Sequence, residues 1–96
     1  MEKRWFEVWV LGYDKDLECT DIEELVGEYA TKEEAFEVAR NLTIDSIFED
    51  GLGLLKPEYL EDGDILDIEV EEVVEPEFEV CQAINSWHVD YLEYKK

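Results

Sequence analysis

Few side chains in this sequence could act as nucleophiles. The chain has one histidine, His88, and two cysteines, Cys19 and Cys81. A cysteine nucleophile needs a base in hydrogen-bond contact, and that base usually needs a third group to orient it. On a helix Cys81 and His88 would lie two turns apart on one face, but nothing marks either as reactive. Because the sequence also has no phosphate-binding loop, dinucleotide-binding glycine motif or nucleophile elbow, we predict that the protein is not an enzyme and has no cofactor.

Carboxylates are abundant, so metal binding is the next chemistry to consider. Asp14, Asp16 and Glu18 stand at alternate positions, as ligands do at the start of an EF-hand loop. The match then fails, because Cys19 replaces the glycine at the sixth position and Leu25 replaces the glutamate at the twelfth. We predict no dedicated metal site, and keep weak binding of divalent cations as an alternative function.

The most regular pattern is an alternation of acidic and apolar residues after residue 64. Alternate residues of a strand project from the same face at intervals of about 6.7 Å, which is half the line density of charge on one nucleic-acid strand. The predicted acidic face consists of Asp67, Glu69, Glu71, Glu75, Glu77 and Glu79. A neighbouring strand or loop that carries Glu58, Glu61, Asp62 and Asp90 could supply further charge.

The charge of the whole chain restricts its partners. Acidic residues outnumber basic ones 28 to 8, and the formal net charge is −20. Between Pro57 and Tyr94 there is no lysine or arginine at all. Like charge repels nucleic acids and anionic membranes, so we expect neither as a direct partner. A basic protein surface is the expected partner, although acidic residues can also form a merely solvated face.

A second candidate interface is aromatic and lies near the N-terminus. If residues 4–13 form a strand, one of its faces carries Trp5, Trp9 and Tyr13. Such a face is either covered or available to another molecule. The C-terminal segment, with Trp87 and Tyr91, could cover it; otherwise it is a protein-binding or homodimer surface.

Hydrophobic periodicity predicts the elements that would position these residues. We expect strands over residues 4–13 and 22–30, with a bulge or a close backbone approach at Gly27. A capping box formed by Thr31 and Glu34 predicts a helix from Thr31 to about Leu42. Residues 44–48 continue that helix or form a second short one, and residues 49–63 form a loop.

The second half of the chain is predicted to be mostly strand. Residues 64–75 form a long strand in which Glu72 is the one acid among the apolar positions, so the register could shift there. Residues 78–94 fit either a helix or strand runs broken at Asn85–Ser86. Their β-branched and aromatic content favours strand.

This order of elements predicts the fold class. We expect a single domain over residues 1–96 of the α+β class, with a mostly antiparallel sheet and one main helix packed on one face. The order is ββαβ(β), which is β-grasp-like only as an analogy. No signal peptide or membrane span is evident, so a cytoplasmic location with free thiols is expected.

These observations support one functional prediction and one main alternative. The prediction is a non-enzymatic acidic interaction domain that binds a basic protein surface and could mimic nucleic acid. The alternative is a small homo-oligomeric domain with an accessory or structural role. The absence of interspersed bases favours a binding surface over a merely solvated face, because ordinary solvated faces mix charges of both signs.

Overall fold

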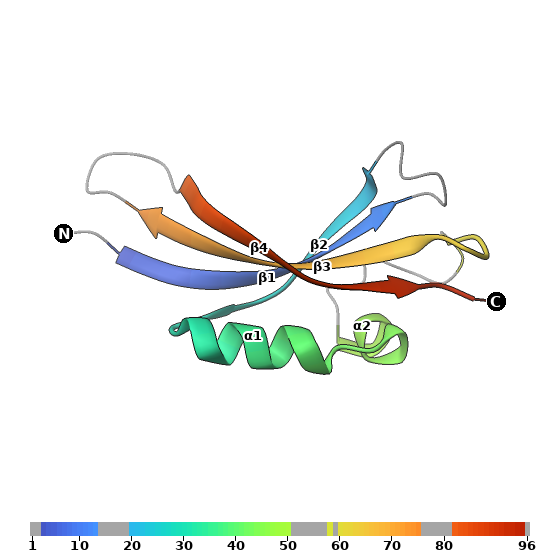
Figure 1. The fold of residues 1–96 in the computed structure, drawn as a ribbon, viewed down its shortest axis with the longest axis horizontal. Coiled ribbons are helices and arrows are strands. Elements are labelled where there is room, and N and C mark those ends of the chain that lie inside the picture. The colour runs from blue at the N-terminus through green and yellow to red at the C-terminus, as the bar shows by residue number, and fades with distance from the viewer. Residues whose placement is uncertain (1–2, 14–19, 51–57, 59, 76–81, 96) are drawn as a thin grey trace.

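The computed structural model of the chain describes residues 3–13, 20–50, 58, 60–75 and 82–95 (Figure 1). Its elements, in order, are β1 (Lys3–Tyr13), β2 (Thr20–Tyr29), α1 (Lys32–Asn41), α2 (Ile44–Asp50), β3 (Ile65–Glu75) and β4 (Gln82–Glu93). The strands form one sheet in the order β2-β1-β3-β4, and every neighbouring pair is antiparallel. Both helices lie on the same side of this twisted sheet (Figure 1). The predicted α+β class is therefore confirmed.

The central strands β1 and β3 pair without interruption from Lys3 opposite Glu75 to Tyr13 opposite Ile65. Unbroken pairing keeps the alternation of side chains intact, so each face of the pair has one character. Val8 and Val10 of β1 point toward the helices, where they are almost fully buried. From β3, Leu66, Ile68 and Val70 point the same way and are 0% exposed.

The helices complete this core. Ala35 and Ala39 of α1 and Ile47 of α2 are buried against the sheet. As predicted, the Thr31 hydroxyl caps α1: it accepts a hydrogen bond from the Glu34 amide at 3.2 Å. Residues 44–50 form a second short helix rather than a continuation of the first.

The edge strand β2 contains a bulge, next to the glycine where one was expected. Val8 pairs with Gly27, whereas Trp9 pairs with Leu25, so Val26 is an extra residue. A Cβ atom on Gly27 would lie 2.6 Å from the Tyr29 hydroxyl oxygen, so the glycine makes room for a side chain rather than for another backbone segment. Because one extra residue reverses the alternation, Glu23 and Glu24, which lie between this bulge and a second register shift opposite Gly12 and Tyr13, face the opposite side from the one that simple counting gives.

The edge strand β4 contains two such irregularities. Ile68 pairs with Asp90 but Glu69 pairs with His88, which leaves Val89 as an extra residue. A second shift lies in β4 between Asn85 and Ala83, which pair with Glu72 and Val73 of β3. It is near the position where the sequence indicated a possible shift. The Val89 bulge reverses the alternation of the β4 residues between the two shifts. It therefore determines toward which face of the sheet each of these side chains points.

Two sequence predictions about the C-terminal region need correction. The strand does not break at Asn85–Ser86; β4 runs through both residues. Nor does this segment cover the N-terminal tryptophans, because it pairs beside β3 and its Trp87 packs on the helix side, 5.8 Å from the Phe36 ring centroid. The analogy with β-grasp domains is not confirmed.

Candidate functional site

The side of the sheet opposite the helices is the candidate site, and we call it the open face. Residues that pair across strands share a face, so the pairing registers define its members. The acidic members are Glu7, Glu23, Glu28, Asp67, Glu69, Glu71, Glu75 and Glu93. Its other members include Lys3, Trp5, Trp9, Leu11, Tyr13, His88 and Tyr91. Carboxylates from four strands and aromatic rings therefore share one surface.

Like charges face each other across the middle of this surface. Glu7 of β1 is paired with Glu28 of β2 on one side and with Glu71 of β3 on the other. Burial raises the pKa of the Glu71 carboxyl, and the nearby Glu7 and Glu23 raise it further. Directly opposed like charges destabilise a sheet. The folded protein therefore contains unfavourable repulsion among these carboxylates, and a bound cation would reduce it.

Glu7 also fixes the two tryptophans of the open face. The Trp5 indole N–H donates to Glu7 Oε2 at 2.8 Å, and the Trp9 indole N–H donates to Glu7 Oε1 at 3.0 Å. Both indoles are half-buried. One carboxylate therefore holds two large aromatic rings beside a group of negative charges.

A second group lies on the same face between β3 and β4. The His88 Nδ1 atom contacts Asp67 Oδ1, and Glu69 is the cross-strand partner of His88. The Tyr91 ring lies against the imidazole, with 3.8 Å between ring centroids. Asp67 is only 4% exposed, whereas the His88 side chain is 38% exposed.

The local environment disfavours ionisation of both carboxyl groups in this cluster. Burial raises the pKa of Asp67, and the neighbouring His88 opposes the change. Burial also raises the pKa of Glu69, followed by the effects of Asp67 and Glu71, with His88 again opposing and Glu23 adding a smaller increase. The charge of Glu71, two residues further along the strand, thus contributes to the raised pKa of Glu69.

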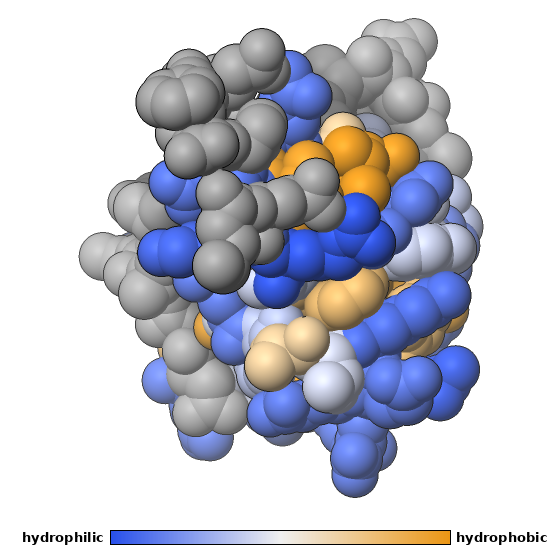
Figure 2. All heavy atoms as spheres, turned by 90° about the vertical axis from the view of Figure 1, so that its left-hand side faces the viewer, coloured by the Kyte–Doolittle hydropathy of each residue, from blue (hydrophilic) through white to orange (hydrophobic). Residues whose placement is uncertain are grey.

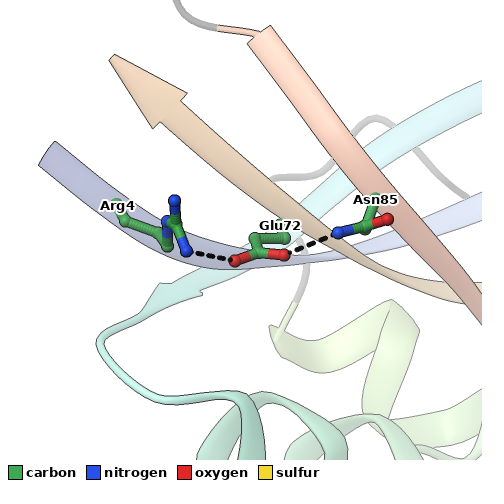
Figure 3. A network of polar contacts seen from close by, with 3 residues as sticks. All are labelled: Arg4, Glu72 and Asn85. Atoms are coloured by element: carbon green, nitrogen blue, oxygen red, sulfur yellow. Dashed lines mark hydrogen bonds and ion pairs between the residues drawn. The ribbon is translucent and has the colours of Figure 1, made fainter. Parts of the chain in front are cut away.

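Glu72 is an acidic residue whose charge has partners within the fold. It lies on the helix side of β3, where Arg4 Nη1 is 3.2 Å from its Oε2 atom. The Asn85 amide donates to its Oε1 atom at 2.9 Å, so three strands meet at this carboxylate (Figure 3). Glu72 therefore has a structural role and does not belong to the open face.

Glu24 is a buried acid that the sequence pattern did not reveal. It pairs with Val10, so the β2 bulge turns it toward the helix side, where it is 1% exposed. Neither carboxylate oxygen has a hydrogen-bond partner among the described residues. Leu25, an apolar residue of this strand, lies on the open face beside Trp9.

The helix side carries a separate surface feature with the opposite charge. A hollow of about 430 Å³ is lined by Lys32, Glu33, Phe36 and Arg40. The Lys32 Nζ atom lies 4.2 Å from the Trp87 ring centroid, and the Arg40 guanidinium lies 5.3 Å from that of Phe36. Both cations are thus engaged with aromatic rings.

The predicted acidic face is realised in part. Asp67, Glu69 and Glu71 lie together on the open face as expected, and Glu75 is exposed at its end, opposite Lys3. Glu77 and Glu79 lie outside the described residues, as do Asp14, Asp16, Glu18 and both cysteines. Asp90 does not add to this face, because it pairs with the core residue Ile68.

The predicted aromatic residues also lie on the open face. Trp5, Trp9 and Tyr13 all belong to it and are half-buried. Alternation along residues 4–13 already places Glu7 with these aromatic residues, but the sequence did not place Glu23 or His88 on this face. Only the pairing register reveals them, because the bulges in β2 and β4 decide which side Glu23 and His88 face.

No protein-family model, curated protein or solved structure matches this chain. Among the described residues, no helix is both long enough and apolar enough to cross a membrane. The surface toward the start of β1 and the end of β3 is largely hydrophilic where residues are described (Figure 2). The open face is therefore the feature of the molecule that indicates a function.

Proposed function

We propose that this protein is a non-enzymatic interaction domain whose open face binds a basic protein surface. The observation that carries the proposal is the row of Glu28, Glu7 and Glu71 across three neighbouring strands. A cation bound there would reduce the repulsion that these carboxylates exert on one another. The −20 net charge would also attract a basic partner from a distance and speed its association.

The composition of the open face favours arginine in the partner. A guanidinium can pair with a carboxylate through two hydrogen bonds and can also stack on an aromatic ring. The half-buried indoles of Trp5 and Trp9 lie beside Glu7, which offers both kinds of contact within one small area. Lysine would gain the charge interaction but not the planar, two-point recognition.

A narrower form of the proposal is that the partner binds nucleic acid and that the open face competes with it. Along β3 the carboxylates recur about every 6.7 Å, which is half the axial charge density of one nucleic-acid strand. Glu7 and Glu23 add charge on the neighbouring strands, about 5–10 Å to the side. This two-dimensional array supports mimicry better than a single line of charge would.

Homo-oligomerisation through the open face is the competing function. Two copies joined in this way would bring their acidic rows together, and the repulsion would oppose association. Charge complementarity therefore favours a basic partner over a second copy. Sedimentation at several protein concentrations separates the two, because only the alternative predicts a dimer that buries Trp5 and Trp9.

Two charge-matched triple variants test the proposal. One replaces Glu23, Glu71 and Glu75 of the open face with lysine. The other replaces Glu33, Glu37 and Glu49, which are exposed on the helices, with lysine. Both variants have the same net charge, so any general attraction of a polyanion for basic proteins is the same in each. Proteins captured from a cell lysate by each variant and by the wild type are identified and then challenged with DNA and RNA.

We expect the open-face variant to lose its specific partners and the helix variant to retain them. The association rate of a retained partner should fall steeply with added salt, because long-range attraction steers it. Equal loss from both variants would contradict a site on the open face. Failure of excess nucleic acid to displace the partners would exclude mimicry and leave the broader proposal standing.

A further inference from the structure

The cluster of Asp67, Glu69 and His88 brings together three potential metal ligands. One ligand atom from each residue can be chosen so that all three lie within 4.8 Å of one another. Ligands of a tetrahedral zinc ion lie about 2.0–2.2 Å from it, so two of them are about 3.4 Å apart. Small rotations of the side chains would therefore bring all three within bonding distance of one ion.

The Asp67 carboxylate is the strongest sign of a ligand. Its side chain is 6% exposed, and its Oδ1 atom accepts no hydrogen bond of good geometry from the described residues. That atom is directed into the cluster, because His88 Nδ1 is in contact with it. Apart from this contact with His88, the buried Oδ1 atom has no hydrogen-bond partner among the described residues, and coordination of a cation would offset the cost of burying it.

The backbone has a feature that assembles this cluster. If Val89 paired with Glu69 in a regular register instead of forming a bulge, His88 would pair with Val70 and face the helices. The bulge places the imidazole on the open face instead, next to Glu69 and against Asp67. Bulges often occur next to functional sites, where they redirect a side chain.

We propose that Asp67, Glu69 and His88 bind one divalent transition-metal ion. One imidazole nitrogen with two carboxylates suits ions of the manganese-to-zinc group better than calcium or magnesium, which prefer oxygen ligands alone. Three protein ligands leave coordination positions open to water or to a group from another molecule. The exposed side of His88 leaves the ion accessible from solvent. This inference does not depend on the protein-binding function proposed above.

The chain's single histidine allows a direct test with Zn²⁺. The imidazole nitrogen resonances of His88 are the only ones of their kind in the NMR spectrum. Full-length protein without an affinity tag is used, with Cys19 and Cys81 replaced by serine because thiolates also bind zinc. The titration is done in about 0.15 M NaCl, where the Debye length is about 8 Å and diffuse cation binding is weakened. Zinc should shift one His88 nitrogen strongly, saturate at one equivalent, and resist displacement by excess Mg²⁺.

Three variants separate a site from diffuse attraction. His88→Gln and Glu69→Gln should each weaken zinc binding by about tenfold or more, since loss of even an outer-shell partner costs about 10–100-fold. Glu37→Gln removes the same charge as Glu69→Gln from an exposed position on α1 and should leave affinity unchanged. Backbone amide spectra establish that each variant is folded.

Two results would overturn the proposal. If the His88 resonances of the protein with native residues at 67, 69 and 88 do not respond to Zn²⁺, the contact with Asp67 is an ordinary ion pair. If they respond but Glu37→Gln weakens binding as much as Glu69→Gln does, the zinc is held by the net charge of the chain. The first result does not depend on any ligand variant, so it stands even if those variants are unstable.

Discussion

The two sides of the sheet are formed by the same strands but differ in the type and burial of their side chains. On the helix side, Val8, Val10 and Ile68 are at most 1% exposed and pack into a continuous aliphatic core. On the open face, Glu69 and Glu71 are half-buried among other carboxylates, and their pKa values are raised. Packing on the helix side thus stabilises the fold, and repulsion among the carboxylates of the open face destabilises it. Surfaces that are unfavourable in the free protein are where binding can release free energy.

Adjacent residues of β3 show the contrast at its smallest scale. Glu72, on the helix side, has partners in Arg4 and Asn85. Glu71, on the open face, has Glu7 as its cross-strand neighbour on β1. The charge of Glu72 is compensated by residues of two other strands, whereas no described residue forms an ion pair with Glu71 on the surface that another molecule could reach.

The largest expected effect comes from the helix side. Ile68→Ala should lower the free energy of unfolding by about 2–5 kcal/mol, because it leaves a cavity in a fully buried position. Leu11→Ala, on the half-buried open face, should cost clearly less. Urea denaturation measures both. Equal costs would show that the open face is a second core, and the contrast between the two sides would be wrong.

Glu24 is an exception on the helix side, and removing its charge should sharpen the contrast. Glu24→Leu is expected to raise the free energy of unfolding by about 1–3 kcal/mol, because both buried carboxylate oxygens lack hydrogen bonds from the described residues. Glu23→Leu, at an exposed neighbouring position, should change it by no more than about 0.5 kcal/mol. A loss of stability in Glu24→Leu would mean that this carboxylate is compensated by residues outside the described ranges.

Neutralising the two adjacent acids of β3 should have effects of opposite sign. Glu72→Gln should lower the free energy of unfolding by about 1 kcal/mol, since it weakens a hydrogen-bonded pair with the half-exposed Arg4. Glu71→Gln should raise it by about 0.2–1 kcal/mol, because it removes a like charge opposite Glu7. Both are measured by urea denaturation at neutral pH with a chelator present. Effects of the same sign would contradict the assignment of the two residues to different electrostatic environments.

The smallest effect is a pH dependence confined to the open face. A raised pKa means that the folded state binds a proton more tightly than the unfolded state. The stabilisation from Asp67, Glu69 and Glu71 is therefore fully present below the ordinary carboxyl pKa of about 4, and it is lost as pH rises through the raised values. The charged groups around them that enter this balance are Glu7, Glu23 and His88.

Glu71→Gln isolates the contribution of one of these groups. Its advantage in unfolding free energy over the wild type should be small near pH 4 and should grow toward pH 7, as Glu71 becomes ionised in the wild type. Chemical denaturation of both proteins at several pH values, with chelator present, measures the difference. An advantage that shrinks with rising pH would mean that the Glu71 charge is stabilised in the folded protein.

The sequence predicts the regular parts of this fold well. Strand β3 follows from strict alternation, and α1 follows from the Thr31 cap and the helical spacing of Ala35 and Ala39. These elements are determined by local patterns, which a sequence displays directly. The same reasoning places Asp67, Glu69 and Glu71 on one face.

The bulges are where sequence reasoning reaches its limit. Gly27 indicates an irregularity, but it does not show that Val26 is the extra residue or that Glu24 becomes buried. In β4 no glycine marks the bulge at Val89, so the side on which His88 lies cannot be read from its neighbours. The side on which such residues lie depends on packing between distant parts of the chain, such as Trp87 of β4 against Phe36 of α1, and such contacts leave no local signal.

The bulges of β2 and β4 have a further consequence, because these strands form the two edges of the sheet. An edge strand can template the addition of strands from other molecules, and proteins guard against such aggregation with charge or with bulges that distort the edge. Near neutral pH the net charge of −20 keeps copies of this chain apart. Near its pI of about 4.1 that repulsion disappears, and the distorted edges become the main barrier to fibril growth. At that pH, therefore, the shape of the edges rather than their net charge would oppose aggregation.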